Sequence, residues 1–212
     1  MKAPVIAVLS LLFLAAGAMA HPPDAPAAKD GAATTPIEPS AGTRDARTYF
    51  TDLPLVTQDG KKVKFYTDTM EGRTVVINTI YTHCTDACPL ITQKMLEIRA
   101  QVGERFGKDV FFLTLSTDPA RDTPQLMKKF AREQGADVPG WLFLTGTKEN
   151  LGHILKKLGM FSPVVEEHST MLIAGNVPAK RWTKIRPEAH ATLIAERLKT
   201  LADATQDPAS AH

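Results

Sequence analysis

Two cysteines, Cys84 and Cys88, stand four positions apart and are the only ones in this chain of 212 residues. They follow a nearly continuous β-branched, apolar run, and Pro89 and a helical pattern come directly after them. The first turn of a helix offers unpaired N–H groups and the positive end of a dipole, and both lower a thiol pKa from its free value of about 8.5. The segment therefore predicts a reactive pair of thiols at the start of a helix.

Three roles are open to such a pair: a structural disulfide, disulfide exchange and metal binding. A structural disulfide usually closes a long loop, so one that spans only three intervening residues stabilises little. A closed structural zinc site needs a second pair of ligands, which this chain's cysteines do not provide. Exchange with a partner's disulfide and capture of a soft ion such as Cu(I) remain, and the spacing alone does not decide between them.

Histidine is the natural third ligand for a site of this kind. His168 differs from the other histidines because it lies where a loop enters a late apolar strand, which is expected beside the cysteine loop. His83 adjoins Cys84, but neighbouring side chains of an extended segment point to opposite faces. The remaining histidines fall in the terminal segments or on solvated helix faces. The candidates are His21, His83, His153, His168, His190 and His212.

The apolar periodicity predicts the elements that position these residues. Strands are expected at 73–81, 110–116 and 141–144, and an antiparallel pair at 169–174 and 181–185 around Gly175-Asn176. Helices are expected at 90–106, ended by Gly107, at 148–158, ended by Gly159, at 187–202, and after Pro124.

In the helix after Pro124, an N-cap at Asp122 or Thr123 precedes the expected inward-facing residues Leu126, Met127, Phe130 and Ala131. The order of the elements is a βαβ half followed by a ββα half. That order predicts an α/β, thioredoxin-like fold with a central mixed β-sheet flanked by helices.

The N-terminal residues read as a signal for export. Lys2 precedes an apolar stretch, and Ala18-Met19-Ala20 has the form of a signal-peptidase site, so residues 1–20 are predicted to be a signal peptide. We therefore expect a periplasmic protein. The alternative is an uncleaved inner-membrane anchor facing the periplasm, although the stretch is short for a span of about 20 residues.

Composition divides the rest of the chain and excludes some functions. Residues 21–46 are rich in Ala and Pro and predict a flexible tether, residues 47–202 the folded domain, and residues 203–212 a disordered tail. The chain is 43% hydrophobic and 23% charged, with a formal net charge of +2 and interspersed signs. This pattern excludes the basic stripe of a nucleic-acid-binding protein, and membrane contact is expected only through the N-terminus or a partner.

Three segments resemble, in order and spacing, the motifs of the SCO/SenC family: Cys84-Thr-Asp-Ala-Cys88-Pro89, Asp118-Pro-Ala-Arg-Asp-Thr-Pro124 and His168-Ser169. The resemblance covers about residues 48–200. It implies a thioredoxin-like fold that binds one copper ion per chain, Cu(I) or Cu(II), through Cys84, Cys88 and His168. It also implies a copper chaperone that delivers copper to, or reduces the cysteines of, the binuclear copper site in cytochrome c oxidase subunit II. Another periplasmic copper protein is the alternative partner.

Asp118 matches an acidic residue that the family keeps near the site. Orienting a ligand, docking the partner and capping the loop before the helix all remain open as its role. The sequence departs from the family pattern at the turn 174–182 and at 164–167, before the histidine. The alternative function is a thiol–disulfide oxidoreductase with Cys84 and Cys88 as its redox-active dithiol and His168 merely nearby, so the question of enzymatic activity stays open.

Overall fold

The computed structural model describes residues 46–204. The predicted signal peptide, nearly all of the predicted tether and most of the predicted tail lie outside the described residues, as do His21 and His212. The strands are β1 (Pro54–Thr57), β2 (Lys62–Lys64), β3 (Thr74–Ile80), β4 (Val110–Ser116), β5 (Trp141–Thr145), β6 (Leu172–Asn176) and β7 (Arg181–Ile185). The α-helices are α1 (Ala46–Phe50), α2 (Phe65–Thr69), α3 (Ala87–Val102), α4 (Pro124–Glu133), α5 (Lys148–Leu158) and α6 (Ala191–Asp203). Two short 3₁₀ turns are η1 (Gly103–Arg105) and η2 (Val165–Glu167).

The strands form one mixed sheet in the order β2-β1-β5-β4-β3-β6-β7. The central strands β3, β4 and β5 are parallel, and β1, β2, β6 and β7 pair antiparallel with their neighbours. All seven positions of β3 are buried, because helices cover both faces of the sheet at its centre. The predicted α/β fold with a mixed sheet flanked by helices is therefore confirmed.

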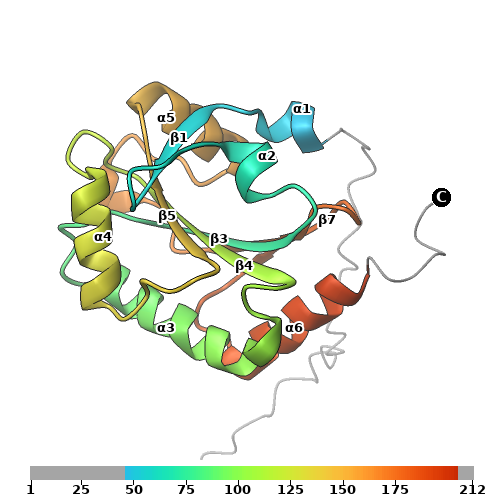
Figure 1. The fold of residues 1–212 in the computed structure, drawn as a ribbon. Helices are drawn as coiled ribbons and strands as arrows, with labels where there is room; N and C mark the ends of the chain where they lie inside the picture. The colour runs from blue at the N-terminus through green and yellow to red at the C-terminus, as the bar shows by residue number, and fades with distance from the viewer. Residues whose placement is uncertain (1–45, 205–212) are drawn as a thin grey trace, which may run out of the picture. The chain divides into compact units, whose positions relative to one another are not determined.

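Two apolar cores lie on the two faces of the sheet. Helices α3, α4 and α6 pack on one face, against Val76, Phe112 and Trp141. Helices α1, α2 and α5 pack on the other face, against Ile77 and Leu113. Figure 1 shows these two layers, with α3 and α6 on one side of the strands and α1, α2 and α5 on the opposite side.

Three loops meet at the carboxyl edge of the central strands. Because β3 and β4 are parallel, the loops 81–86 and 117–123 leave the sheet at the same edge. Strand β6 runs antiparallel to β3, with Ile173 opposite Ile77, so the loop 159–171 enters the sheet at this edge as well. The fold thereby gathers the segments that carry the cysteines, Asp118 and His168.

Four local predictions are wrong. Helix α3 ends at Val102 rather than at Gly107, because Gly103 adopts a φ of 65° and starts a 3₁₀ turn. Gly175 and Asn176 lie within β6 rather than between the two paired strands. The ring of Trp182 packs so closely against Gly175 that a Cβ on this residue would overlap it.

The start of α6 and one face of α4 also differ from expectation. Helix α6 begins at Ala191, and the Nδ1 atom of His190 caps it by accepting a hydrogen bond from the Thr192 N–H. Leu126 is 42% exposed, since it lies at the edge of the apolar face that buries Met127. The cap of α4 is Thr123, one of the two predicted residues.

Candidate functional site

The cysteine loop is a tight turn that delivers Cys84 to the start of α3. The Cys84 N–H donates to the Tyr81 carbonyl at 3.1 Å, and the Cys88 N–H donates to the Cys84 Sγ at 3.3 Å. Cys84 is 9% exposed, Cys88 is completely buried, and both are free thiols. The first turn of the helix therefore directs a backbone N–H at the Cys84 sulfur.

The two thiols differ in acidity. Burial alone would raise the pKa of Cys84, but hydrogen bonds from the Cys88 N–H and side chain, from Asp86 and from Tyr81 outweigh it and lower this pKa. Burial raises the pKa of Cys88, and the neighbouring Cys84 and Asp122 raise it further. The predicted lowering of a thiol pKa at the helix start is thus confirmed for Cys84 and wrong for Cys88, which lies deeper in the apolar core.

His168 reaches the dithiol from the position directly after η2, far along the chain. Its Nδ1 lies 3.0 Å from the Val165 carbonyl oxygen, which only accepts, so Nδ1 is the donor of this hydrogen bond. This Nε2 lies 3.9 Å from the Cys88 Sγ. His168 is 7% exposed, and burial lowers its pKa, which favours the neutral imidazole that metal ions bind.

The separation between His168 and Cys88 suits a shared ion. At the metal–sulfur and metal–nitrogen distances typical of zinc, about 2.3 and 2.0 Å, one ion spans at most about 4.3 Å between its two ligand atoms. The observed 3.9 Å lies within this reach. Within residues 46–204, no three His, Cys, Asp or Glu side chains are already gathered tightly enough to enclose an ion. Closing a site around Cys84, Cys88 and His168 therefore takes movement of at least one of these three side chains.

Tyr81 is a site residue that the sequence analysis missed. Its ring lies against two imidazoles, with centroids 4.7 Å from His83 and 5.4 Å from His168. A hydrogen bond with Cys84, together with burial, raises the pKa of Tyr81 to about 12. The only sequence signal for it is its place directly after the buried strand β3, at the edge where loops carry function.

Asp118 makes its contacts away from the three candidate ligands. Its carboxylate lies 3.8 Å from the Nε of Arg121, whose Nη1 is 3.3 Å from the Nε2 of the exposed His83. The backbone carbonyl of Asp118 accepts from the N–H groups of Arg121 and Asp122 at 3.0 and 2.9 Å. These contacts are those of a residue that closes the turn before α4.

The other described histidines lie apart from the cysteines. His153 is exposed on α5, and His190 caps α6. Of the histidines in residues 46–204, His168 is therefore the one that the fold brings to the dithiol. His83 shares the cysteine loop but pairs with Arg121.

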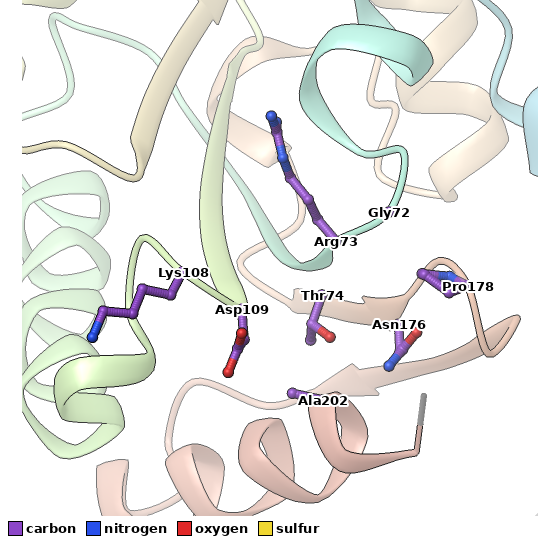
Figure 2. A pocket seen from close by; sticks show the side chains of 8 residues that line it. All are labelled: Gly72, Arg73, Thr74, Lys108, Asp109, Asn176, Pro178 and Ala202. Atoms are coloured by element: carbon purple, nitrogen blue, oxygen red, sulfur yellow. The ribbon is translucent and has the colours of Figure 1, made fainter. Parts of the chain in front are cut away.

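A cavity of about 100 Å³ lies at the opposite edge of the sheet, between the start of β3 and the end of α6. Figure 2 shows that the side chain of Arg73 points away from it, in agreement with its hydrogen bond to the Asp68 carbonyl. Asn176 beside the cavity donates to the Leu201 carbonyl and accepts from the Ala179 N–H, so its amide serves the fold. The chemistry of the described chain is thus concentrated at the cysteine edge.

A mixed sheet covered by helices on both faces, with a dithiol at the start of the helix after a central strand, defines a thioredoxin-like protein. The SCO1/SenC family model matches residues 41–202, and the chain belongs to this family. No helix within residues 46–204 is both long and apolar enough to span a membrane.

Individual relatives agree with this membership. The chain is 31% identical over 93 residues, 44% of this chain and 47% of the relative, to the SCO1 protein homolog of Bacillus subtilis. The structure of Bradyrhizobium japonicum ScoI with copper bound matches with a TM-score of 0.58 and 22% identity over 70% of this chain and 96% of that chain. BsSco, described as a Sco-family cytochrome c oxidase assembly protein with a disulfide switch, matches with a TM-score of 0.61 and 22% identity over 72% of this chain and 92% of that chain. The chain spans about half the length of the curated relatives it matches.

Proposed function

We propose that this chain is an exported copper chaperone that binds one copper ion through Cys84, Cys88 and His168. The observation that carries the proposal is the 3.9 Å approach of the His168 Nε2 to the Cys88 Sγ, whose own backbone N–H donates to the Cys84 sulfur. Two thiolates favour Cu(I) by their softness, and an imidazole also suits Cu(II). The copper-bound structure of the related ScoI supports the same cargo.

The proposed acceptor is the binuclear copper site of cytochrome c oxidase subunit II. Three protein ligands leave copper open to an incoming thiolate, so copper is handed over by ligand exchange at the carboxyl edge of the sheet. Exposed apolar side chains at this edge support contact with a protein. Four of the five large apolar side chains exposed in the described chain lie there, in first helical turns or in the loop before η2: Leu90, Leu126, Val164 and Leu193.

Export to the periplasm is part of the proposal. Its support is the segment 1–20, in which a basic residue, an apolar stretch and a small-residue cleavage pattern follow one another. N-terminal sequencing of the mature protein, recovered from the periplasmic fraction, tests it: cleavage after Ala20 leaves His21 as the first residue. An intact N-terminus in the membrane fraction would favour the anchored alternative.

The central experiment is loading of the reduced protein with Cu(I), followed by metal quantification and competition with a chelator. The expected result is about one copper per chain. His168→Ala should lower the affinity by at least about tenfold, since loss of a residue that only orients a ligand already costs about 10–100-fold. His153→Ala removes an exposed histidine from α5 and should leave the affinity unchanged. Absence of copper in the reduced wild type would refute the proposal.

The second candidate function is thiol–disulfide exchange, which the unequal thiols favour. The Cys84 thiolate would attack a partner's disulfide and form a mixed disulfide, and Cys88 would then attack the Cys84 sulfur. This step releases the partner as a dithiol and leaves one disulfide on the chain, so two electrons pass to the partner. Rapid reduction of a protein disulfide by a chain that takes up no copper would favour this function.

A further inference from the structure

A carboxylate without exposed surface lies beneath the cysteine loop. Asp122 is 0% exposed, and its Oδ1 accepts hydrogen bonds from the Thr82 N–H at 3.0 Å and from the Thr82 hydroxyl at 2.6 Å. Its Oδ2 accepts a third hydrogen bond, from the Ser116 hydroxyl, at 2.6 Å. These three hydrogen bonds satisfy both oxygens of the buried carboxyl group.

The hydrogen bonds join two loops that are 40 residues apart in the chain. The backbone of Asp122 is fixed in the turn before α4, because its N–H donates to the Asp118 carbonyl at 2.9 Å and α4 begins two residues later. Thr82 is the residue whose position these hydrogen bonds fix. It lies inside the turn that the hydrogen bond from the Cys84 N–H to the Tyr81 carbonyl closes, so displacement of Thr82 also displaces Cys84.

We propose that Asp122 is the positioning residue of the dithiol: by holding Thr82 it sets where the Cys84 sulfur lies relative to Cys88 and His168. The inference deepens the proposed copper function, and its expected effect on metal affinity rests on that function. Its expected effect on the positions of the two thiols does not. Asp118, four residues earlier, carries the same chemical group with different contacts. Its carboxylate lies 3.8 Å from Arg121, whose side chain is 70% exposed, and within residues 46–204 it makes no direct hydrogen bond to the cysteine loop; the link runs through the contact of Arg121 with the exposed His83.

The test compares Asp122→Asn with its matched control Asp118→Asn. Both variants exchange a carboxylate for an amide of the same shape in the same turn. Two constants are measured at a temperature at which circular dichroism reports both variants folded. They are the Cu(I) affinity, by chelator competition, and the equilibrium constant of the Cys84–Cys88 disulfide against glutathione without copper.

Asp122→Asn should lower the Cu(I) affinity about 10–100-fold, the cost of losing a group that orients a metal ligand. It should also shift the disulfide equilibrium constant by at least about tenfold, which a general loss of stability in a folded protein would not do. Asp118→Asn should leave both constants within about threefold of the wild type. The proposal is overturned if Asp122→Asn changes neither constant, or if Asp118→Asn changes them as much.

A second variant covers the case in which Asp122→Asn does not fold. Thr82→Val removes the hydroxyl donor and keeps the N–H, and it should shift both constants in the same direction by a smaller factor; no shift would overturn the proposal. If the wild type takes up no Cu(I), the proposed copper function fails, while the glutathione equilibrium still decides the role of Asp122.

Discussion

Alkylation of the two thiols should be strongly unequal in the folded protein. The perturbation is a pair of single-cysteine variants, Cys88→Ser, which retains Cys84, and Cys84→Ser, which retains Cys88. Serine keeps a small polar side chain in each position, and the Cys88 N–H that faces the Cys84 Sγ at 3.3 Å remains. We expect iodoacetamide to modify Cys84 much faster than Cys88.

The size of the difference follows from the two pKa shifts and from burial. A free thiol with a pKa of about 8.5 is about 3% thiolate at pH 7. Hydrogen bonds lower the pKa of Cys84, and burial raises the pKa of Cys88. The thiolate fractions of the two cysteines therefore move in opposite directions. A lower pKa also reduces nucleophilicity, which leaves a net gain in rate of about threefold for each pKa unit that separates the two thiols. Cys84 is 9% exposed and Cys88 0%, so access adds to this factor.

The assay is mass spectrometry of the alkylated variants over time at pH 7, with the same reaction in urea as the control. In urea the two rates should converge, because both the helix start and the apolar cover are lost. The expected ratio in the folded protein is at least about threefold in favour of Cys84. Equal rates, or faster modification of Cys88, would refute the account of how the helix start and burial divide the pair.

Three further predictions follow from the fold and the site. Burial lowers the pKa of His168 below its ordinary value of about 6.5, so the unfolded state binds more protons at this residue. Its contribution to the free energy of unfolding is therefore fully present above about pH 6.5 and falls as the pH drops. His168→Gln should remove this part of the pH dependence of stability, measured by urea unfolding between about pH 7 and 5. Gly175→Ala should lower the free energy of unfolding by about 1–3 kcal/mol or more, because the new Cβ would overlap the Trp182 ring. Gly152→Ala in α5 should raise it by about 0.5–1 kcal/mol, and urea unfolding measures both changes. Leu90→Asp should slow copper transfer to a soluble acceptor domain at unchanged copper loading, since this side chain is 67% exposed at the cysteine edge.

The central elements were predictable because their patterns are local. Strands β3 and β4 are continuous apolar runs, and α5 has a cap at Thr147 and an αL glycine at Gly159. No helix or strand was predicted in residues 47–69, since α1, β1, β2 and α2 are only three to five residues long and take their shape from packing on the sheet. The exposure of Leu126 was also out of reach, because periodicity does not locate the edge of an apolar face.

The sequence by itself determined that Cys84 and Cys88 form a pair at the start of a helix, since both lie between a buried strand and Pro89, after which the helical pattern begins. Tertiary structure decided the rest of the site. The ring of His168 meets Cys88 only because β6 enters the sheet where β3 leaves it, and Asp122 reaches the cysteine loop only because β3 and β4 are parallel neighbours. Burial then separated the acidities of two thiols that are equivalent in the sequence, because the cost of charging a sulfur depends on what surrounds it.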